Sequence, residues 1–417
     1  MTETSHAGGR GGGKGTSAAD APGTVAVASG VPDAGAAGAG TGAAGAGAGA
    51  AGRVPWPSPA VPFPAWRDLR SILVVKTSAL GDIIHALPTL YALRSLFPEA
   101  RLCWAAEPRF AGILPGPPWI DSVVPYRKDE LRALPFWKIP GALRGMARGM
   151  RASRFDLALD LQGLMKSTLV CLLSGARKRL GYCEMREGSF LFTRPVKGPN
   201  RAGHVIERYL DVARSLGPVP DEVRFPLPDC SGERDAFRRE LLGLGLSGPL
   251  ALIFPGAGWA SKLWPPASYA RLAARLSAAG MAVALGGGPG DADLASEIIS
   301  LAKAPLPDLC GRTDIRGLMG LTSLASLCVG ADTGPLHLAA AQGTPTVSLF
   351  GPSSGRRAGT WGLSARYVQT DAPCSPCFKR RCPKKEFVCM GRIDPEAVFR
   401  AALEVLPLGP PRALEDG

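Results

Sequence analysis

One carboxylate in a glycine-containing turn is the first feature of this sequence that could carry out chemistry. Asp82 ends the stretch KTSALGD, which separates the apolar run at residues 72–75 from apolar residues at helical spacing. A buried strand followed by a helix leaves backbone N–H groups at the turn without intrahelical partners, so a ligand can bind above the sheet edge. The sequence therefore predicts a reaction centre at this turn, with the Asp82 carboxylate in its mouth.

Two loops in the second half of the chain carry residues suited to binding a diphosphate. The motif DTGPLH begins at Asp332, where a strand is expected to end, so the N–H groups of a helix N-terminus could face phosphate oxygens. The same motif would also serve as an ordinary helix cap. The loop PGAGWASK adds flexible backbone and the Lys262 cation, and the joint pattern favours phosphate binding. The glycine-rich loop at residues 286–290 lacks the GxGxxG spacing, so it is interpreted first as a tight turn and second as a contact for a bound donor substrate. His85 and His337 each lie one helical turn into a helix, where an isolated histidine is more often structural.

Alternating strand and helix patterns predict the elements that position these residues. Each half of the chain has apolar strands followed by helices, which favours an α/β fold with two doubly wound, mostly parallel sheets. Ligands of such sheets bind beyond the carboxyl ends of the strands, here in a central cleft between two domains. We place the N-terminal domain at residues 66–245 and the C-terminal domain at residues 246–417. Strands are expected at residues 72–75, 101–106, 122–124, 155–161, 179–182, 250–254, 281–285, 327–330 and 346–350.

The composition limits the remaining function classes. Residues 1–65 are dominated by Ala, Gly and Pro and lack bulky apolar side chains, which predicts disorder and argues against a secretory signal peptide. No later window gives about 18 uninterrupted apolar residues, so no transmembrane helix is expected. A net charge of +13 with a pI near 9.5 indicates an anionic partner. Nucleic acid is the least favoured of such partners, because basic and aromatic residues are seldom interleaved as base stacking requires.

Residues 126–154 form a basic and partly apolar segment. They carry eight Arg or Lys residues against Asp129 and Glu130, interleaved with apolar side chains such as Trp137. The segment would suit an anionic membrane surface. A solvated helix whose arginines extend their stems along apolar neighbours explains the pattern equally well.

Four of the ten cysteines cluster near the C-terminus, at Cys374, Cys377, Cys382 and Cys389. Four thiolates could bind a structural metal such as zinc, although the later spacing is not that of a zinc ribbon. Reduced thiols and a disulfide are the alternatives, and a disulfide would be unusual in a cytoplasmic enzyme. No histidine-rich metal-binding motif accompanies the cluster, and no metal is expected at the reaction centre.

Several motifs together resemble a known enzyme family. The segments KTSALGDIIHALPTL, DLQGLMKS, HVIER, FPGAGWASKLWP and ADTGPLHLAAAQGTPTVSLFGPS occur in this order and closely resemble the lipopolysaccharide heptosyltransferases of glycosyltransferase family nine. The resemblance implies a GT-B fold, with two Rossmann-like domains facing a central cleft. It also implies transfer of L-glycero-D-manno-heptose from ADP-heptose to the Kdo or heptose of the lipopolysaccharide inner core, with inversion and without a required cofactor.

The resemblance also implies roles for individual residues. Asp82 resembles the catalytic base for the acceptor hydroxyl, and Lys262 resembles the lysine that neutralises the departing diphosphate. Ala257 and Gly258 stand where some members have threonines, so only their backbone could contact the donor. The implied donor-binding residues are Ala257, Gly258, Asp332, Thr333, Gly334 and His337. The implied acceptor-binding residues are Ser78, Gly81, Arg127, Lys128, Gln162, Lys166 and Arg186.

The partners implied by the resemblance are an ADP-sugar donor, a Kdo-lipid A or heptosylated inner-core acceptor and the anionic surface of the inner membrane, but no nucleic acid. The implied location is cytoplasmic, at the inner face of that membrane. Two alternatives remain open: a family-nine transferase that uses a different nucleotide sugar, and a non-catalytic nucleotide-sugar binding protein. Asp82 and Lys262 argue against the second alternative, because a sensor has no need of a base.

Overall fold

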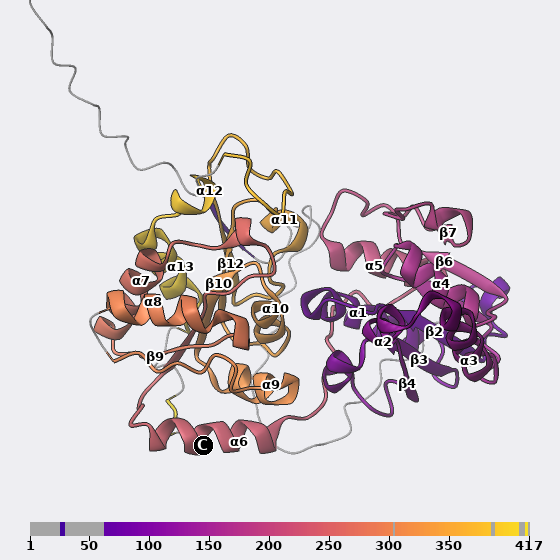
Figure 1. Cartoon of the computed structure of the whole chain (residues 1–417), viewed down its shortest axis with the longest axis horizontal. Coiled ribbons are helices and arrows are strands. Elements are labelled where there is room, and N and C mark those ends of the chain that lie inside the picture. The colour runs from indigo at the N-terminus through magenta and orange to yellow at the C-terminus, as the bar shows by residue number, and fades with distance from the viewer. Residues whose placement is uncertain (1–25, 30–61, 303–304, 385–387, 408–412, 416–417) are drawn as a thin grey trace, which may run out of the picture.

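The first half of the chain is built around a six-stranded parallel sheet. The structure is a computed structural model that describes residues 26–29, 62–302, 305–384, 388–407 and 413–415 (Figure 1). The sheet has the order β4-β3-β2-β5-β6-β7, and every neighbouring pair in it is parallel. Its strands are β2 (Ser71–Val75), β3 (Arg101–Ala106), β4 (Ser122–Pro125), β5 (Leu157–Asp160), β6 (Lys178–Gly181) and β7 (Arg194–Pro195).

Helices cover both faces of this sheet because its central strands are apolar on both sides. In β2 all five residues are buried; Ile72 and Val74 join a core formed with α1 and α5, whereas Leu73 and Val75 join a second core on the opposite face. This alternation is the pattern expected of a strand with two covered faces. The helical elements are η1 (Pro64–Trp66), α1 (Leu80–Leu96), η2 (Pro108–Ile113), α2 (Lys128–Ala133), η3 (Phe136–Lys138), α3 (Ile139–Arg151), α4 (Met165–Leu173), η4 (Ser189–Leu191) and α5 (Val205–Arg214).

The second half repeats this arrangement around its own sheet, with the order β1-β12-β11-β10-β8-β9. Strands β8 to β12 pair in parallel, so the predicted α/β class with two mainly parallel sheets is confirmed. The strands are β8 (Leu250–Phe254), β9 (Ala282–Leu285), β10 (Leu327–Ala331), β11 (Thr346–Phe350) and β12 (Ala365–Gln369). The helical elements are η5 (Ala260–Lys262), α7 (Pro266–Ala278), η6 (Pro289–Asp291), α8 (Ala292–Ala302), α9 (Ile315–Leu324), α10 (Gly334–Ala341), α11 (Gly355–Ala358), α12 (Val388–Gly391) and α13 (Pro395–Val405).

The helix between the two sheets, α6 (Ser231–Gly243), packs against the second one (Figure 1). Its buried residues Phe237 and Leu241 share a core with Leu250, and Glu233 forms an ion pair with Arg316 of α9 at 2.8 Å. The predicted division between residues 245 and 246 groups α6 with the first sheet. Its apolar face and its ion pair instead connect it to the second.

The N-terminal tail contributes one strand to the second sheet. Residues Ala26–Ser29 form β1, which pairs antiparallel with β12. For these residues the prediction of disorder is wrong, because their backbone pairs with the free edge of β12. The prediction also covered residues 62–65, which are described and include the start of η1. Residues 1–25 and 30–61 lie outside the described residues. Among the helices that are described, none combines the length and the apolar character needed to cross a membrane.

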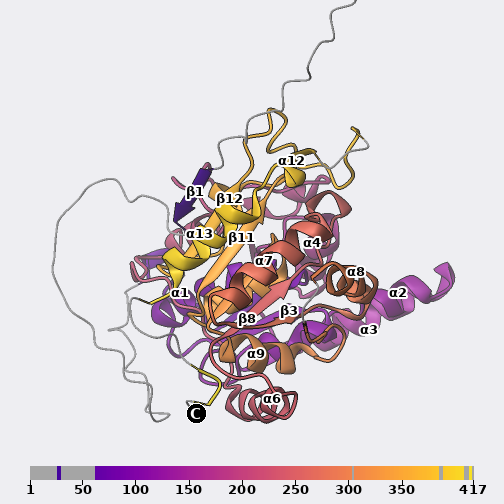
Figure 2. The ribbon, with the colours of Figure 1, turned by 90° about the vertical axis from the view of Figure 1, so that its left-hand side faces the viewer.

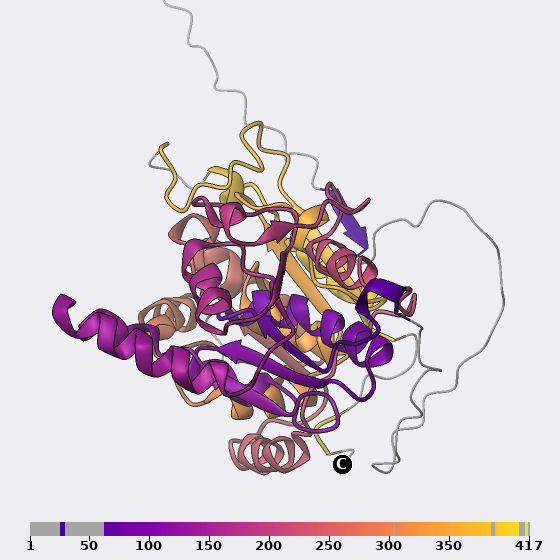
Figure 3. The same ribbon diagram turned by 90° about the vertical axis from the view of Figure 1, so that its right-hand side faces the viewer.

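The helices α2 and α3 form an arm that projects from the first half, and both side views show it extending beyond the rest of the chain (Figure 2, Figure 3). The 3₁₀ turn η3 joins the two helices, which correspond to the predicted basic segment at residues 126–154. Met150 and Ala147 of α3 are buried against the body, while Arg144 and Arg148 are exposed.

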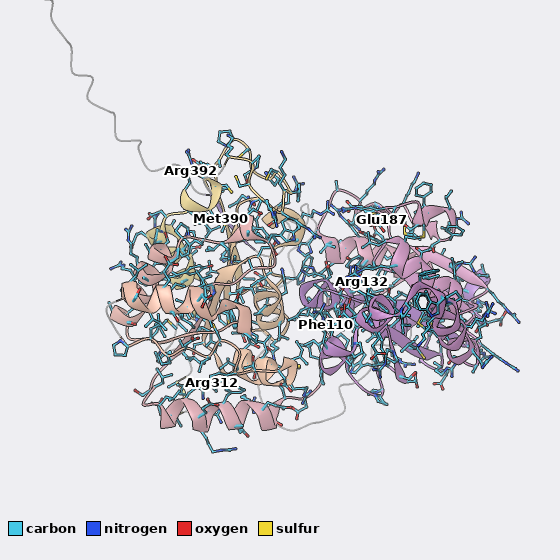
Figure 4. All side chains as sticks on the ribbon, in the orientation of Figure 1. Phe110, Arg132, Glu187, Arg312, Met390 and Arg392 are labelled. Carbon is cyan, nitrogen blue, oxygen red and sulfur yellow. The ribbon has the colours of Figure 1, made fainter. Side chains whose placement is uncertain are left out.

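The two halves meet through helices that start at the sheet edges. A Cβ atom added to Gly81 in α1 would lie 2.7 Å from the His337 ring in α10, and one added to Gly334 would lie 2.9 Å from the Leu80 side chain. A side chain larger than glycine at either position would separate the two helix N-termini. Phe110, in η2, also lies where the first half faces the second (Figure 4). The carboxyl ends of both sheets therefore open toward one junction.

Candidate active site

The turn after β2 places a carboxylate beside a buried ammonium group. Lys76 is almost fully buried, and its Nζ donates hydrogen bonds to the Leu161 carbonyl at 3.0 Å and to the Tyr209 hydroxyl at 2.8 Å. Asp82 lies in the first turn of α1, where its Oδ2 accepts a hydrogen bond from the Ala79 backbone N–H at 3.3 Å and its Oδ1 lies 3.9 Å from Lys76 Nζ. With 48% of its side chain exposed, Asp82 is oriented from one side and accessible to a substrate from the other.

A neighbouring loop brings three predicted acceptor-side residues to this turn. Gln162 Oε1 accepts hydrogen bonds from the backbone N–H groups of Thr77 at 3.2 Å and Ser78 at 3.3 Å. Lys166 Nζ donates to Ser78 Oγ at 3.5 Å. Burial lowers the pKa of Lys166, and the positive charge of Lys128 lowers it further. Ser78, Gln162 and Lys166 thus gather on the turn that carries Asp82.

Asp160 fixes the shape of that loop, although the sequence analysis did not select it. From the carboxyl end of β5, its carboxylate accepts hydrogen bonds from the backbone of Gln162 and Gly163 and from the hydroxyls of Ser167 and Thr168. Burial raises the pKa of Asp160, and these hydrogen bonds oppose the rise. An acidic residue that ends a short apolar strand just before a Gln-Gly turn is the signal that could have identified it.

The predicted acceptor-side cations Arg127 and Lys128 lie at the base of the arm. Arg127 is exposed and forms an ion pair with Glu130 at 2.7 Å. Lys128 Nζ lies 3.9 Å from the buried Glu107 carboxylate, and its charge acts on Lys166. Lys128 therefore lies close enough to Lys166 for their charges to interact, whereas Arg127 forms its ion pair within the arm.

Arg186, the remaining predicted acceptor-side cation, belongs to an ion-pair network between the two halves. Glu184 pairs with Arg208 at 2.5 Å, with Arg186 at 3.7 Å and, across the junction, with Arg357. Burial would raise the pKa of Glu184, but the hydrogen bond and charge of Arg357, followed by the charges of Arg208 and Arg186, hold it below its ordinary value. The structure assigns Arg186 a contact in this network, not one with the Asp82 turn.

On the second half, one carboxylate organises the predicted donor-side residues. Asp332 Oδ2 accepts hydrogen bonds from Lys262 Nζ and from Ser353 Oγ, each at 2.7 Å, and Oδ1 accepts one from His337 Nε2 at 3.2 Å. Burial alone would raise the pKa of Asp332, but the His337 hydrogen bond and the Lys262 charge outweigh it and hold the pKa well below its usual range. Lys262 also lies over the Trp259 ring, 4.4 Å from its centroid. Lys262, Asp332 and His337 therefore act as one unit.

Glycine-rich loops next to this unit surround a cavity of about 360 Å³. The Asp291 carboxylate accepts a hydrogen bond from the Gly288 N–H at 2.8 Å, and a Cβ atom on Gly256 would overlap that carboxylate. The second interpretation of residues 286–290, as a donor contact, is favoured by their position, because four of these glycines line the same cavity as Ala257, Gly258 and Thr333. The lining residues are Phe254, Gly256, Ala257, Gly258, Gly286, Gly287, Gly288, Gly290, Asp291, Thr333 and Pro335. Exposed backbone in such loops suits the diphosphate of a nucleotide.

Two buried histidines connect the halves of the site. His85 Nε2 lies 3.1 Å from His337 Nδ1. Because the Asp332 carboxylate can only accept, a neutral His337 carries its proton on Nε2, and His85 Nε2–H then donates to His337 Nδ1. Burial lowers the pKa of His85, as do the charges of His337, His204 and Lys76. The lone-histidine interpretation of His85 missed this contact, since its partner is 252 residues away.

Among the described residues, no disulfide joins the clustered cysteines Cys374, Cys377, Cys382 and Cys389, so the disulfide alternative is wrong. Burial raises the pKa of Cys389, and the neighbouring three cysteines raise it further. Within the described ranges, which omit residues 385–387, no three or more His, Cys, Asp or Glu side chains are grouped so that they could hold a metal ion.

The arrangement is suited to a displacement between two substrates bound on opposite sides of the junction. Asp82 can take a proton from a hydroxyl that approaches the first half. Lys262 and the loop N–H groups can stabilise negative charge that develops on a diphosphate bound at the second half. Gly81, next to Asp82, packs on the His337 ring. The proton-accepting turn of the first half therefore contacts the diphosphate-binding unit of the second half directly.

Comparison with known proteins gives matches over most of the chain. Residues 143–388, more than half of the sequence, match the model of Glycosyltransferase family 9 (heptosyltransferase). Lipopolysaccharide heptosyltransferase 1 of Pseudomonas aeruginosa is 29% identical over 361 residues, which cover 81% of this chain and 98% of that protein.

Two solved Escherichia coli structures are similar in fold. ADP-heptose lps heptosyltransferase II is 25% identical with a TM-score of 0.65, and the match covers 80% of this chain and 98% of that one. Heptosyltransferase WaaC with ADP-2-deoxy-2-fluoro heptose is 23% identical with a TM-score of 0.60, covering 80% and 99% of the two chains.

Proposed function

The chain belongs to glycosyltransferase family 9, the heptosyltransferase family, and from this premise we propose that it transfers L-glycero-D-manno-heptose from ADP-heptose to the Kdo or heptose of a lipopolysaccharide inner core. The observation that carries the proposal is the contact between Gly81 and His337, which joins the Asp82 turn to the Lys262–Asp332 unit. The nucleotide sugar bound by the similar WaaC structure, ADP-2-deoxy-2-fluoro heptose, supports ADP-heptose as the donor.

In the proposed reaction, the Asp82 carboxylate removes the proton from the acceptor hydroxyl as its oxygen attacks the anomeric carbon of the donor. The bond from that carbon to the diphosphate breaks on the opposite side, so the configuration inverts. Lys262 and the N–H groups around Thr333 and Gly258 stabilise the charge on the departing ADP. Because Lys262 provides this charge, we expect turnover to persist in EDTA.

Ser78, Gln162 and Lys166 are proposed to bind the acceptor, since hydrogen bonds hold them together on the turn that carries Asp82. An acidic sugar would meet the cations Lys166 and Lys128. The proposed setting is the cytoplasmic face of an anionic inner membrane, which would hold a lipid-linked acceptor within reach.

The test is to incubate the purified chain with ADP-heptose and either Kdo-lipid A or a heptosylated core, and to follow ADP release and product mass. Release with one of these acceptors supports the proposal. Release only with another nucleotide sugar favours a different family-9 transferase. Donor binding without turnover on any acceptor favours a binding protein.

The proposed base is tested by Asp82→Asn. We expect this variant to bind ADP normally but to turn over at least about 100-fold more slowly, the usual scale for a lost general base. Asp68→Asn, at an exposed carboxylate on the amino side of β2, is the matched control and should keep full activity. Equal turnover of Asp82→Asn and the control would remove Asp82 from the mechanism.

A further inference from the structure

The tip of the projecting arm exposes two large aromatic side chains. Phe136 is 78% exposed and Trp137 is 66% exposed, although both are among the most apolar side chains. Their rings pack edge to face, with centroids 5.1 Å apart, so they form one paired apolar tip. Single exposed apolar residues are common, but an aromatic pair at the end of a projecting element is typical of a surface that enters another phase.

A row of cations without carboxylate partners runs along α3, the helix that follows this tip. From residue 133 to residue 154 the chain has five Arg or Lys residues and no Asp or Glu. Arg144, Arg148 and Arg151 lie at helical spacing on α3 and are exposed, and no ion pair is formed by them among the described residues. Three unpaired guanidinium groups in one row match the phosphates of a lipid surface.

Apolar volume lies beneath the same helices. A cavity of about 530 Å³ separates α2 and α3 from β4, and Leu131, Leu134, Met146 and Met150 are among its lining residues. The arm is therefore not a closed, fully packed unit. Its helices have room to adjust against a bilayer, and methionine side chains adapt readily to such changes.

The base of the arm leads directly to the candidate acceptor site. The charges of Lys128 and Arg132, both in α2, act on Lys166, and Lys166 donates to Ser78 on the Asp82 turn. Arg132 lies on the first half of the chain, on the side toward the viewer (Figure 4). An acceptor whose lipid anchor stays in a bilayer could thus reach Asp82 while the arm rests on that bilayer.

From these observations we propose that the arm formed by α2, η3 and α3 docks the protein on an anionic lipid bilayer. Phe136 and Trp137 enter the interfacial region, and Arg144, Arg148 and Arg151 contact lipid phosphates. The inference deepens the proposed function and rests on it only for the nature of the lipid-linked acceptor.

The test is flotation of the full chain with vesicles of phosphatidylcholine alone or of an equal mixture with phosphatidylglycerol. We expect the wild type to bind the mixed vesicles. Phe136→Ser/Trp137→Ser should weaken this binding at least about tenfold. Arg144→Gln/Arg148→Gln/Arg151→Gln should weaken it on the order of 100-fold, because each cation near an anionic surface contributes about fivefold.

A matched control removes equally exposed groups from the second half. Leu363 is 88% exposed, and Arg239 and Arg271 are exposed cations, so Leu363→Ser/Arg239→Gln/Arg271→Gln should bind as the wild type does. A second measurement is tryptophan fluorescence, which should shift to shorter wavelength on mixed vesicles in the wild type but clearly less in Trp137→Phe. Failure of the wild type to bind mixed vesicles would overturn the inference. Equal binding by the wild type and both arm variants, or equal weakening by the control, would do so as well.

Turnover assays separate this inference from the proposed function. The arm variants should keep full turnover on a lipid-free oligosaccharide acceptor and lose it only on an acceptor embedded in vesicles. Loss on both acceptors would show that the arm residues act in the reaction itself and would overturn the docking role. If the proposed function fails, no variant releases ADP, but the flotation result still decides whether the arm binds lipid.

Discussion

The Lys262–Asp332 ion pair should contribute strongly to the stability of the second half, and Asp332→Asn tests this. The side chains of Lys262 and Asp332 are only 13% and 11% exposed, and Nζ lies 2.7 Å from Oδ2. At an effective dielectric constant of about 20, this separation corresponds to an attraction of about 6 kcal/mol, part of which the desolvation of both ions offsets. Removing one partner leaves the other charge buried and unpaired, so Asp332→Asn and Lys262→Met should each cost about 3 to 5 kcal/mol.

A double-mutant cycle separates the pair from its surroundings. In urea unfolding at neutral pH, the double variant Lys262→Met/Asp332→Asn should cost less than the sum of the single variants by about 2 to 3 kcal/mol. The exposed pair Arg275–Glu396, at 2.9 Å with side chains 51% and 46% exposed, is the control. Its cycle should give less than about 1 kcal/mol. A coupling between Lys262 and Asp332 no larger than that of the control would refute the reasoning.

The pH dependence of the free energy of unfolding tests the same ion pair independently. Because the pKa of Asp332 is held below its ordinary value, its stabilisation is complete above the unfolded-state pKa of about 4 and is lost as the pH falls below it. The stability difference between the wild type and Asp332→Asn should therefore stay constant from pH 7 to about pH 5 and shrink in more acidic solution. A difference that grows on acidification would contradict the assigned ionisation.

Two further predictions concern the junction and the glycine loops. Burial lowers the pKa of His204 to about 4, so its neutral form contributes stability that is present above the ordinary pKa of about 6.5 and is lost as the pH falls toward 4. Between pH 7 and pH 4 the wild type should lose about 3 kcal/mol more than His204→Asn in urea unfolding, and parallel losses would contradict this. Gly256→Ala, whose added methyl group overlaps a neighbouring carboxylate, should weaken ADP binding at least about tenfold by calorimetry, since the loops must move apart. Gly258→Ala, which has open space, should bind ADP normally, and equal behaviour of the two variants would contradict the packing argument.

The predicted GT-B fold is confirmed. Strands were predicted correctly where the sequence has a continuous apolar run. The runs at residues 101–106, 250–254 and 346–350 coincide with β3, β8 and β11, because strands covered on both faces need continuous apolar residues. The strand β12, with the sequence ARYVQ, was not predicted, because Arg366 and Gln369 leave it without a continuous apolar run. It pairs with β11 on one side and, on the other, with β1, which lies more than 300 residues earlier in the chain.

In the site as well, features that depend on neighbouring residues in the sequence could be predicted, and contacts between distant segments could not. Asp82, Lys262 and Asp332 each lie in a short segment between a strand end and the next helix or in that helix's first turn, so their positions at the sheet edges could be predicted. Ser353 acts through a hydrogen bond to Asp332, 21 residues earlier, and neither its type nor its spacing distinguishes it from an ordinary turn residue. Asp160 bonds to the residues just after it, so the acidic end of a short apolar strand could have identified it. The sequence indicates which groups could react, but their hydrogen-bonding partners depend on the tertiary arrangement.

Helix α1 shows why these partners matter for the proposed reaction. Asp82 and His85 are three residues apart in its first turns, so they lie on neighbouring positions of one rigid element. Asp82 follows the turn residues Thr77 and Ser78, to which Gln162 and Lys166 are hydrogen-bonded. His85 Nε2 lies 3.1 Å from His337 Nδ1, and His337 Nε2 is hydrogen-bonded to Asp332. A change in the distance between the two halves at His85 therefore also displaces the proposed base relative to Lys262. The geometry of proton removal and the geometry of diphosphate departure are coupled through a single helix.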